Sequence, residues 1–203
     1  MKLKLIEIAL FLSLFISVIS CISFEKDCDG IREKVLRLHV IANSDREEDQ
    51  NLKLKVRDRI LLESENIFSP ADNLTDAETG VEEGLEALKE CAEKAVKDVG
   101  YSYNVTVSFE PSYFPTRTYE TVTLPAGNYK SLKVIIGEGK GRNWWCVLFP
   151  PMCLSAATKE EEVLSAVLSE DELSLVSAKP QYEVRFWIVE KFQELKNSYK
   201  SKS

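Results

Sequence analysis

The sequence is poor in the residues that most hydrolytic and metal-binding sites require. It contains a single histidine, His39, and its five cysteines form no CxxC pair. Catalytic nucleophiles paired with a base, and zinc sites, draw on histidine and on closely spaced cysteines. His39 lies between Leu38 and Val40 in an apolar stretch, which favours a hydrogen-bonded structural role. We therefore expect a protein that is not an enzyme and has no metal or cofactor.

The chain also lacks a dense block of lysine and arginine. Its formal net charge is −7, and binding to nucleic-acid phosphates needs a concentrated basic surface, so we expect no nucleic-acid partner. Gly137, Gly139 and Gly141 are spaced like a phosphate-binding loop, but such a loop must open a helix. The residues that follow are aromatic, β-branched and finally proline. They predict a strand, so the glycine-rich segment is expected to join two strands.

The one long apolar run lies at the N-terminus. Lys2 and Lys4 precede an apolar run over residues 8–19, and the small residues Ser20 and Ser23 follow it. This order is typical of a secretory signal peptide, and the run is shorter than the roughly 20 residues of a spanning helix. We predict a signal peptide over residues 1–23 and export of the remainder. An uncleaved membrane anchor is the alternative.

Cys21 closes the segment Val18-Ile19-Ser20-Cys21, which also fits a bacterial lipobox. Under that interpretation Cys21 becomes the lipid-modified N-terminus of the mature protein. Under the other, the leader is an ordinary signal peptide with an incidental cysteine. Membrane contact is expected only through the leader or through such a lipid anchor.

An even number of cysteines remains once Cys21 is set aside, and in an exported protein this suggests disulfide bonds. Cys146 and Cys153 flank a segment with two prolines that could turn the chain back, and we predict that they are bonded. For Cys28 and Cys91 we predict a second bond that ties the N-terminal arm to a helix. Four buried free thiols are the alternative.

The period of the apolar residues divides the mature chain into helical and extended parts. A buried strand is expected at 35–41, followed by a helix over 45–63 that starts at a capping box of Ser44 and Glu47. A second helix, with Thr75 and Glu78 at its start, is expected to end near Gly100. Strict alternation then predicts strands at 103–109, 117–124, 129–136 and 144–149, with a tight turn at 125–127.

The last part of the chain is harder to interpret. Residues 158–179 are acidic and form either a mobile arm or a helix with Val163, Val167 and Leu168 packed inward. Apolar residues recur at helical spacing from Val184 to Leu195, which predicts a terminal amphipathic helix. Together the elements predict one α+β signalling domain over residues 31–195, a mixed β-sheet with helices packed against it. A flexible tail over residues 196–203 is expected to follow.

Two adjacent tryptophans provide the candidate binding surface. On a strand, Trp144 and Trp145 point to opposite faces, so only one of them is easily placed in the core. An outward tryptophan beside a flexible Gly139–Arg142 loop would suit protein binding, because tryptophan and arginine are enriched at binding hot spots. The candidate partner-binding residues are Lys140, Arg142, Asn143, Trp144 and Trp145. The alternative is that flanking helices bury both tryptophans.

Several segments resemble the stage II sporulation protein R family. They are 39–45 (HVIANSD), 48–50 (EDQ), 54–58 (LKVRD), 125–129 (PAGNY), 184–187 (VRFW) and, most distinctively, 137–153 (GEGKGRNWWCVLFPPMC). The resemblance implies an exported, non-enzymatic signal that is secreted from the forespore into the intermembrane space. There it would activate a membrane-embedded aspartic protease that processes the mother-cell sigma-E precursor. The competing classes are an exported thiol-dependent enzyme that uses Cys146, and a structural component of the envelope.

Overall fold

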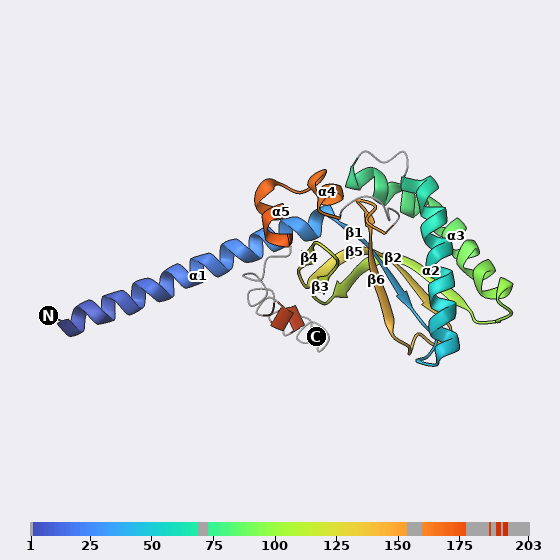
Figure 1. The fold of residues 1–203 in the computed structure, drawn as a ribbon, viewed down its shortest axis with the longest axis horizontal. Helices are drawn as coiled ribbons and strands as arrows, with labels where there is room; N and C mark the ends of the chain where they lie inside the picture. The colour runs from blue at the N-terminus through green and yellow to red at the C-terminus, as the bar shows by residue number, and fades with distance from the viewer. Residues whose placement is uncertain are drawn as a thin grey trace.

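The leader and the start of the domain form one continuous helix. Helix α1 runs from Lys2 to Lys34, and its first part projects away from the rest of the chain (Figure 1). Side chains over residues 4–23 are exposed, whereas Phe24, Cys28 and Ile31 are buried. By length and composition this helix could cross a membrane, and its apolar part fits the predicted signal peptide.

The structure is a computed structural model that describes residues 2–68, 73–153 and 160–177, with residues 187, 190, 191, 193 and 194. The predicted tail over 196–203 lies outside these residues, as does most of the predicted terminal helix. Residues 187, 190, 191, 193 and 194, which belong to that helix, are helical.

A mixed four-stranded sheet forms the centre of the domain, with the strand order β2-β5-β1-β6. Strand β1 (Leu36–Ile41) is parallel to β5 (Gly127–Ile136) and antiparallel to β6 (Asn143–Phe149). Strand β2 (Val105–Phe114) is antiparallel to β5. The arrangement confirms the predicted α+β class and leaves β2 and β6 as the two edge strands of this sheet.

Two long helices cover one face of this sheet (Figure 1). Helix α2 spans Glu47–Phe68 and helix α3 spans Leu74–Asp98. Their apolar stripes pack on alternate residues of the strands because side chains i and i+4 share one helix face and residues i and i+2 share one sheet face. We call this cluster the first core. It includes Leu38, Val40, Leu52, Val56, Ile60, Val81, Leu88, Leu132 and Val134.

The helix starts differ in detail from the predicted capping boxes. Helix α3 begins after Asn73, whose side-chain oxygen accepts a hydrogen bond from the backbone N–H of Asp76 at 3.0 Å. Helix α2 begins at Glu47, and the Ser44 hydroxyl accepts from the N–H of Arg46 instead of capping with Glu47. Both predicted helices are present, but other groups cap their starts, and α2 continues to Phe68, beyond the predicted end at residue 63.

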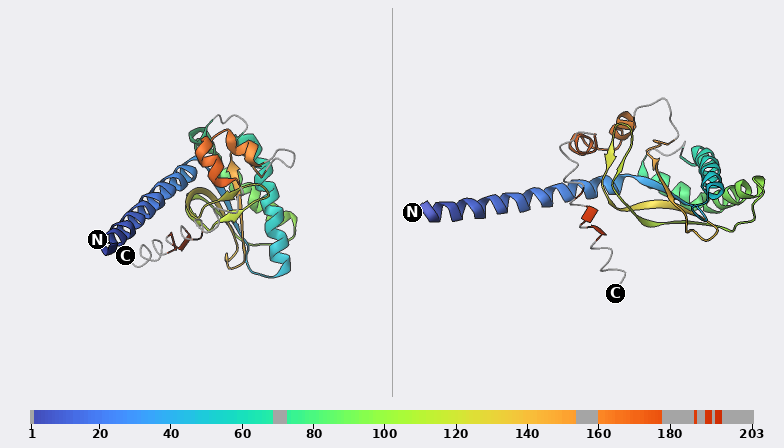
Figure 2. Two further views of the ribbon diagram at one scale, coloured as in Figure 1. Left: turned by 60° about the vertical axis from the view of Figure 1, so that its left-hand side comes forward. Right: turned by 60° about the horizontal axis from the view of Figure 1, so that its bottom comes forward.

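Short elements cover the opposite face of the sheet, as the two views of Figure 2 show. They are the end of α1, the β3–β4 hairpin (Arg117–Thr118 and Thr123–Leu124), α4 (Glu160–Ser165) and α5 (Glu170–Val176). The prediction of one strand over 117–124 is wrong, because the chain reverses there and the two halves pair with each other. The acidic region contains two short helices over its described part.

These short elements enclose a second core. Its buried residues include Phe24, Cys28, Ile31, Phe114, Leu124, Tyr129, Leu164 and Val176. Val163 packs inward from α4, as the helical interpretation expected, whereas Val167 and Leu168 pack inward from the turn between α4 and α5. The strand residues on this face are more polar than those on the first: Arg37, His39 and Ser131 are buried there.

The structure joins Cys146 to Cys153, with their Cα atoms 6.3 Å apart. The predicted bond between Cys28 and Cys91 is wrong, because both are free thiols. Cys28 is buried in the second core. Cys91 lies on α3, on the opposite face of the sheet, and its thiol points at the carbonyl oxygen of Arg59 in α2 at 3.6 Å. The two thiols belong to different layers of the domain.

Candidate functional site

The glycine-rich loop between β5 and β6 is fastened to the segment that connects β1 with α2. The N–H of Lys140 donates to the carbonyl of Asn43 at 3.1 Å, and that of Gly141 to the carbonyl of Ala42 at 2.9 Å. The N–H of Glu138 donates to the Asn43 side chain at 2.9 Å. The loop was expected to be flexible, but these hydrogen bonds hold it along its length.

Two of the glycines are required by this close approach. Gly137 adopts a φ of 58°, a backbone conformation that residues with a Cβ rarely adopt. Gly141 lies so close to the Ser44 carbonyl that a Cβ there would collide with backbone atoms. The glycines that resembled a phosphate loop therefore serve to bring two backbone segments together.

Asp49 organises the segment on the other side of this contact. Its carboxylate is buried and accepts hydrogen bonds from the Asn43 amide at 2.9 Å and from the Ser44 hydroxyl. Burial alone would raise the pKa of Asp49, but hydrogen bonds from Ser44, Asn43 and Tyr103 outweigh it and hold the pKa below its usual value. The carboxylate therefore stays charged and fixes the loop that receives Glu138 and Lys140.

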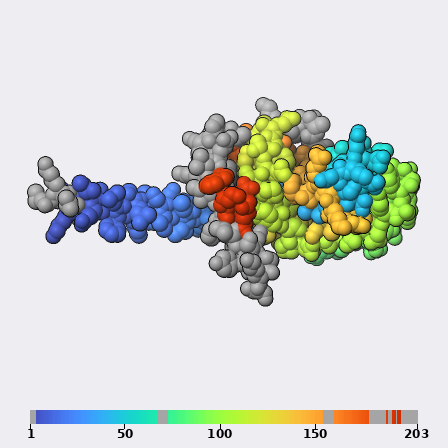
Figure 3. Space-filling model, turned by 90° about the horizontal axis from the view of Figure 1, so that it is seen from below, coloured from blue at the N-terminus to red at the C-terminus, as the bar shows by residue number. Residues whose placement is uncertain are grey.

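The backbone of Arg142 is fixed as firmly. Its N–H donates to the Asp45 carboxylate at 2.7 Å, and its carbonyl accepts from the buried Lys53 ammonium at 3.0 Å. The Arg142 guanidinium itself is exposed, as is the ammonium of Lys140, which pairs with Glu138 at 2.7 Å. In Figure 3 the orange residues of this region form a continuous surface beside the cyan start of α2.

Trp144 and Trp145 point to opposite faces of the sheet, and each is half-buried beneath an arginine. The Arg57 guanidinium lies 4.3 Å from the centre of the Trp144 ring, and that of Arg117 lies 4.0 Å from the Trp145 ring. Trp145 also stacks on His39, with ring centres 5.8 Å apart. Neither predicted alternative holds completely, because neither tryptophan stands free and neither is fully buried.

His39 is held in place by Asn143. The His39 Nε2 lies 2.9 Å from the Asn143 side-chain oxygen, while Nδ1 is buried without a hydrogen-bond partner. Burial lowers the pKa of His39, the Asn143 hydrogen bond opposes this, and the positive charges of Lys133 and Arg37 lower it further. The ring is therefore neutral at physiological pH and acts as a packing platform for Trp145, as the sequence favoured.

Arg37 is a buried cation beside this platform. Its guanidinium lies 4.3 Å from the ring centre of Phe114 and 4.9 Å from that of Tyr129, and it donates to the Tyr119 hydroxyl. Nη1 has no partner, and no carboxylate pairs with Arg37 in the part of the chain that the structure describes. Its Nε also donates to the Cys146 carbonyl at 3.4 Å, and the aromatic faces stabilise its charge further.

An open cleft of about 350 Å³ lies beside β6. Both tryptophans line it, together with Cys146 and Cys153, so the disulfide forms part of its wall. One side comes from α2, through Arg57 and Leu61, and the other from Tyr119 and Glu160. Because Cys146 is bonded to Cys153, an enzyme that uses the Cys146 thiolate would need this bond reduced.

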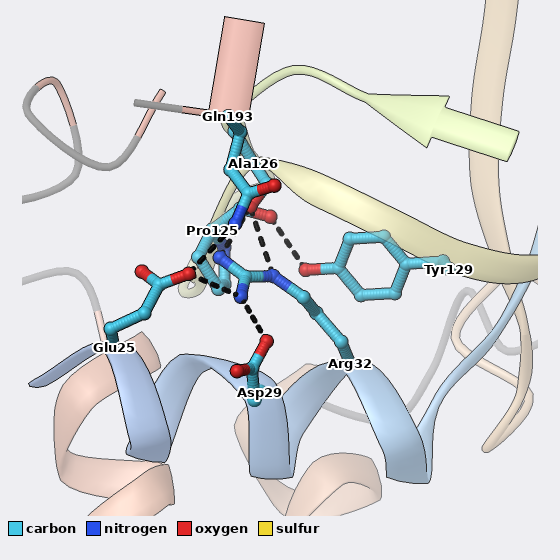
Figure 4. Close-up of polar contacts among 7 residues, drawn as sticks. All are labelled: Glu25, Asp29, Arg32, Pro125, Ala126, Tyr129 and Gln193. Carbon is cyan, nitrogen blue, oxygen red and sulfur yellow. Dashed lines mark hydrogen bonds and ion pairs between the residues drawn. The ribbon is translucent and has the colours of Figure 1, made fainter. Parts of the chain in front are cut away.

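Figure 4 shows a polar cluster that the sequence did not reveal. The buried Arg32 guanidinium donates to the Ala126 carbonyl through Nε at 3.0 Å and Nη2 at 2.6 Å. Its Nη1 pairs with Glu25 at 3.0 Å and Asp29 at 2.6 Å. A Cβ at Gly127 would collide with Arg32. The tight turn at 125–127 therefore binds the side chain of Arg32 at the end of α1.

The fold and this surface define a class: a single α+β domain behind an apolar N-terminal helix. In its described residues no group of three or more His, Cys, Asp or Glu is placed to hold a metal ion.

Residues 32–159 match the family model of stage II sporulation protein R. The chain is also 31% identical over 185 residues to "Stage II sporulation protein R" of Bacillus subtilis (strain 168), covering 81% of this chain and 83% of that protein. The chain belongs to the stage II sporulation protein R family, as the resemblance implied. That relative is named as a sporulation protein and not as an enzyme. No solved structure matches this chain.

Proposed function

We propose that this protein is an exported signal of sporulation that activates a membrane-embedded aspartic protease, and that the protease then processes the mother-cell sigma-E precursor. Membership of the stage II sporulation protein R family carries the proposal. The apolar leader supports export, and family membership supports secretion from the forespore into the intermembrane space. In the mature protein the leader is cleaved, replaced by a lipid on Cys21, or kept as a membrane anchor.

The surface formed by residues 137–145 supports a role as a ligand. A ligand shifts an equilibrium only by its differential affinity for the two states of its target, and a preorganised surface loses little entropy on binding. Hydrogen bonds to Asn43 and from Lys53 hold the backbone of this loop. The exposed cations Lys140 and Arg142 therefore project from a fixed frame toward the protease.

Reconstitution in a non-sporulating host tests this proposal. The protease and the sigma-E precursor are expressed with and without this chain, and precursor cleavage is scored by immunoblot. We expect cleavage only when the chain is present and exported. Cleavage without the chain, or no cleavage with an exported and folded chain, would contradict the proposal.

Arg142→Ala tests the contact surface in the same host. We expect cleavage to fall at least tenfold, because the exposed guanidinium is lost while the backbone bonds to Asp45 and Lys53 remain. Arg59→Ala is the matched control, since Arg59 is a half-exposed arginine of α2 that pairs with Asp98 at 3.6 Å. Equal cleavage by the two variants would remove this loop from the contact.

A thiol-dependent enzyme remains the alternative class, and the double replacement of Cys146 and Cys153 by serine separates the two. The signalling proposal expects a less stable protein that still triggers cleavage when folded. If the protein were an enzyme that uses Cys146, the double variant would remain folded but would no longer support precursor cleavage.

A further inference from the structure

We infer that the outer edge of β6 accepts an extended, acidic segment of a protein partner as an additional strand of the sheet. The identity of the partner rests on the proposed function, but the chemistry of the site does not. The inference follows from three features: the unpaired edge, the cleft beside it and the charges on its rim.

Strand β6 has a neighbour on one side only among the described residues, because β1 is its single partner in the sheet. The N–H of Val147 donates to the sulfur of Cys153 at 3.3 Å and therefore points away from β1. In an antiparallel pair the direction alternates along the strand. The backbone N–H and C=O groups of Trp145 and Asn143 consequently also point outward, which is the template that strand addition uses.

The cleft lies along this same edge and is bounded from both faces of the sheet. Trp144, Arg57 and Leu61 belong to the side of α2, whereas Trp145, Tyr119 and Glu160 belong to the other side. Successive side chains of an extended segment alternate between two faces. An added strand would therefore meet a tryptophan on each side, whereas a helix would meet only one.

The preference for acidic side chains follows from the arginines beside the cleft, of which Arg117 is the one without a carboxylate partner among the described residues. Arg57 and Arg117 lie over the two tryptophan rings, and Arg142 stands at the start of β6. Asp58 already pairs with Arg57 at 2.6 Å and Asp45 with Arg142 at 3.7 Å, and Glu160 accepts from the N–H of Thr121 at 2.8 Å.

Arg117 makes no ion pair with any residue that the structure describes. Its guanidinium lies 4.0 Å from the centre of the Trp145 ring, which lines the cleft. A carboxylate of the partner complements this guanidinium.

Buried donors at the same place point to a missing acceptor. The indole Nε1 atoms of Trp144 and Trp145 are both buried without a hydrogen-bond partner, and buried polar groups in folded proteins are nearly always paired. Both tryptophans line the cleft. An added strand with acidic side chains would bring acceptors to each side of β6.

Proline at position 143 tests the backbone pairing. Asn143→Pro removes an outward N–H and no hydrogen bond to β1, and edge strands tolerate proline at such positions. Asn143→Ala is the matched control, because it loses the same bond to His39 but keeps the N–H. We expect precursor cleavage by Asn143→Pro to be at least tenfold below that of Asn143→Ala, at a similar melting temperature. Equal cleavage by two folded variants would overturn the inference.

Charge reversal gives a second test that does not depend on the proline variant folding. A peptide of five Val-Glu repeats is titrated into the full-length chain in detergent, and tryptophan fluorescence reports binding. We expect saturable binding that a Val-Lys peptide does not show, and at least tenfold weaker binding to Arg117→Glu than to the control Arg59→Glu. Equal affinity for both peptides, or for both variants, would overturn the inference.

The two assays separate this inference from the proposed function. If the wild-type chain triggers cleavage but Asn143→Pro and Arg117→Glu behave like their controls, the edge is not the contact and the signalling role stands. If the wild-type chain triggers no cleavage but binds the acidic peptide selectively, the edge site stands and the protease is not its partner.

Discussion

The two faces of the sheet are closed by different means. On the first face, α2 and α3 cover the strands with long apolar stripes, and the buried polar residues Asp49, Lys53 and Ser64 lie on α2, not on the strands. On the second face, short helices and a hairpin enclose a core that also contains the buried polar residues Arg32 and Arg37. The stability of the first core comes mainly from buried apolar area, whereas that of the second also depends on individual polar contacts. The proposed binding edge lies on β6, where the two faces meet.

Leu88→Ala addresses the first face and should have the largest effect. Leu88 is fully buried on α3, and removing such a side chain costs about 2–5 kcal/mol of unfolding free energy. Chemical denaturation monitored by circular dichroism measures the change. Leu62→Ala on the exposed side of α2 is the control and should stay within about 0.5 kcal/mol. A loss below about 1 kcal/mol for Leu88→Ala would show that this face is not the main source of stability.

The disulfide at the meeting of the two faces should contribute less. The bonded cysteines are separated by 7 positions, and closing so short a loop stabilises by about 2–3 kcal/mol in the chain-entropy model. We expect reductant to lower the unfolding free energy by this amount and to leave a Cys146→Ser/Cys153→Ser variant unaffected. An identical response of the two proteins to reductant would show that the bond does not form.

Glu172→Ala addresses the second face and should lower stability by about 1–2 kcal/mol. Glu172 pairs with Lys34 of α1 at 2.6 Å and accepts from the N–H of Ser169 at 2.7 Å, which closes the capping box of α5. Hydrogen exchange over residues 160–177 should rise while α2 and α3 stay protected. Asp171→Ala, on the exposed side of the same turn, is the control. Uniform loss of protection would show that both faces unfold as one unit.

The smallest expected effect is the pH dependence that His39 contributes. The pKa of His39 is lowered in the folded protein from its usual 6.5, so the unfolded chain takes up the proton first as the pH falls. Its contribution to stability is therefore complete above pH 6.5 and declines below it. Denaturation between pH 7.5 and 5.5 should show this decline, and His39→Gln should reduce it. The same slope in both proteins would place the titration elsewhere.

The first face could be predicted from the sequence because its signals are periodic. Leu52, Val56 and Ile60 recur at helical spacing, and they mark the stripe of α2 that packs on the sheet. Strand β2 is the informative exception. Its alternation was expected to end before Pro111, but β2 is an edge strand, where proline is tolerated, and it continues to Phe114. The position of β2 at the edge of the sheet therefore decides its length, although the local sequence with Pro111 predicts an earlier end.

The second face could not be predicted because its contacts join residues far apart in the sequence. Arg32 and Ala126 are 94 residues apart, and no periodicity connects them. The organisation of the candidate site could not be predicted for the same reason, because its two segments are far apart in the sequence. The segments 39–45 and 137–153 are separate motifs in the sequence, yet they form the two sides of one contact, in which Gly141 bonds Ala42 and Lys140 bonds Asn43. Strand order, which makes β6 an edge, is likewise not encoded in local spacing.

The continuity of α1 has a consequence for how far the signal travels. Only two residues separate Cys21 from Phe24, which is already buried in the domain, and at 1.5 Å per helical residue this is about 4.5 Å along the axis. A lipid on Cys21 would therefore leave no flexible linker between the bilayer and the folded domain. The protein would diffuse along the membrane surface, and the helix would set the distance between the domain and the bilayer. Leader cleavage up to residue 23 would instead release a messenger free in three dimensions, so processing of this one turn selects the range of the signal.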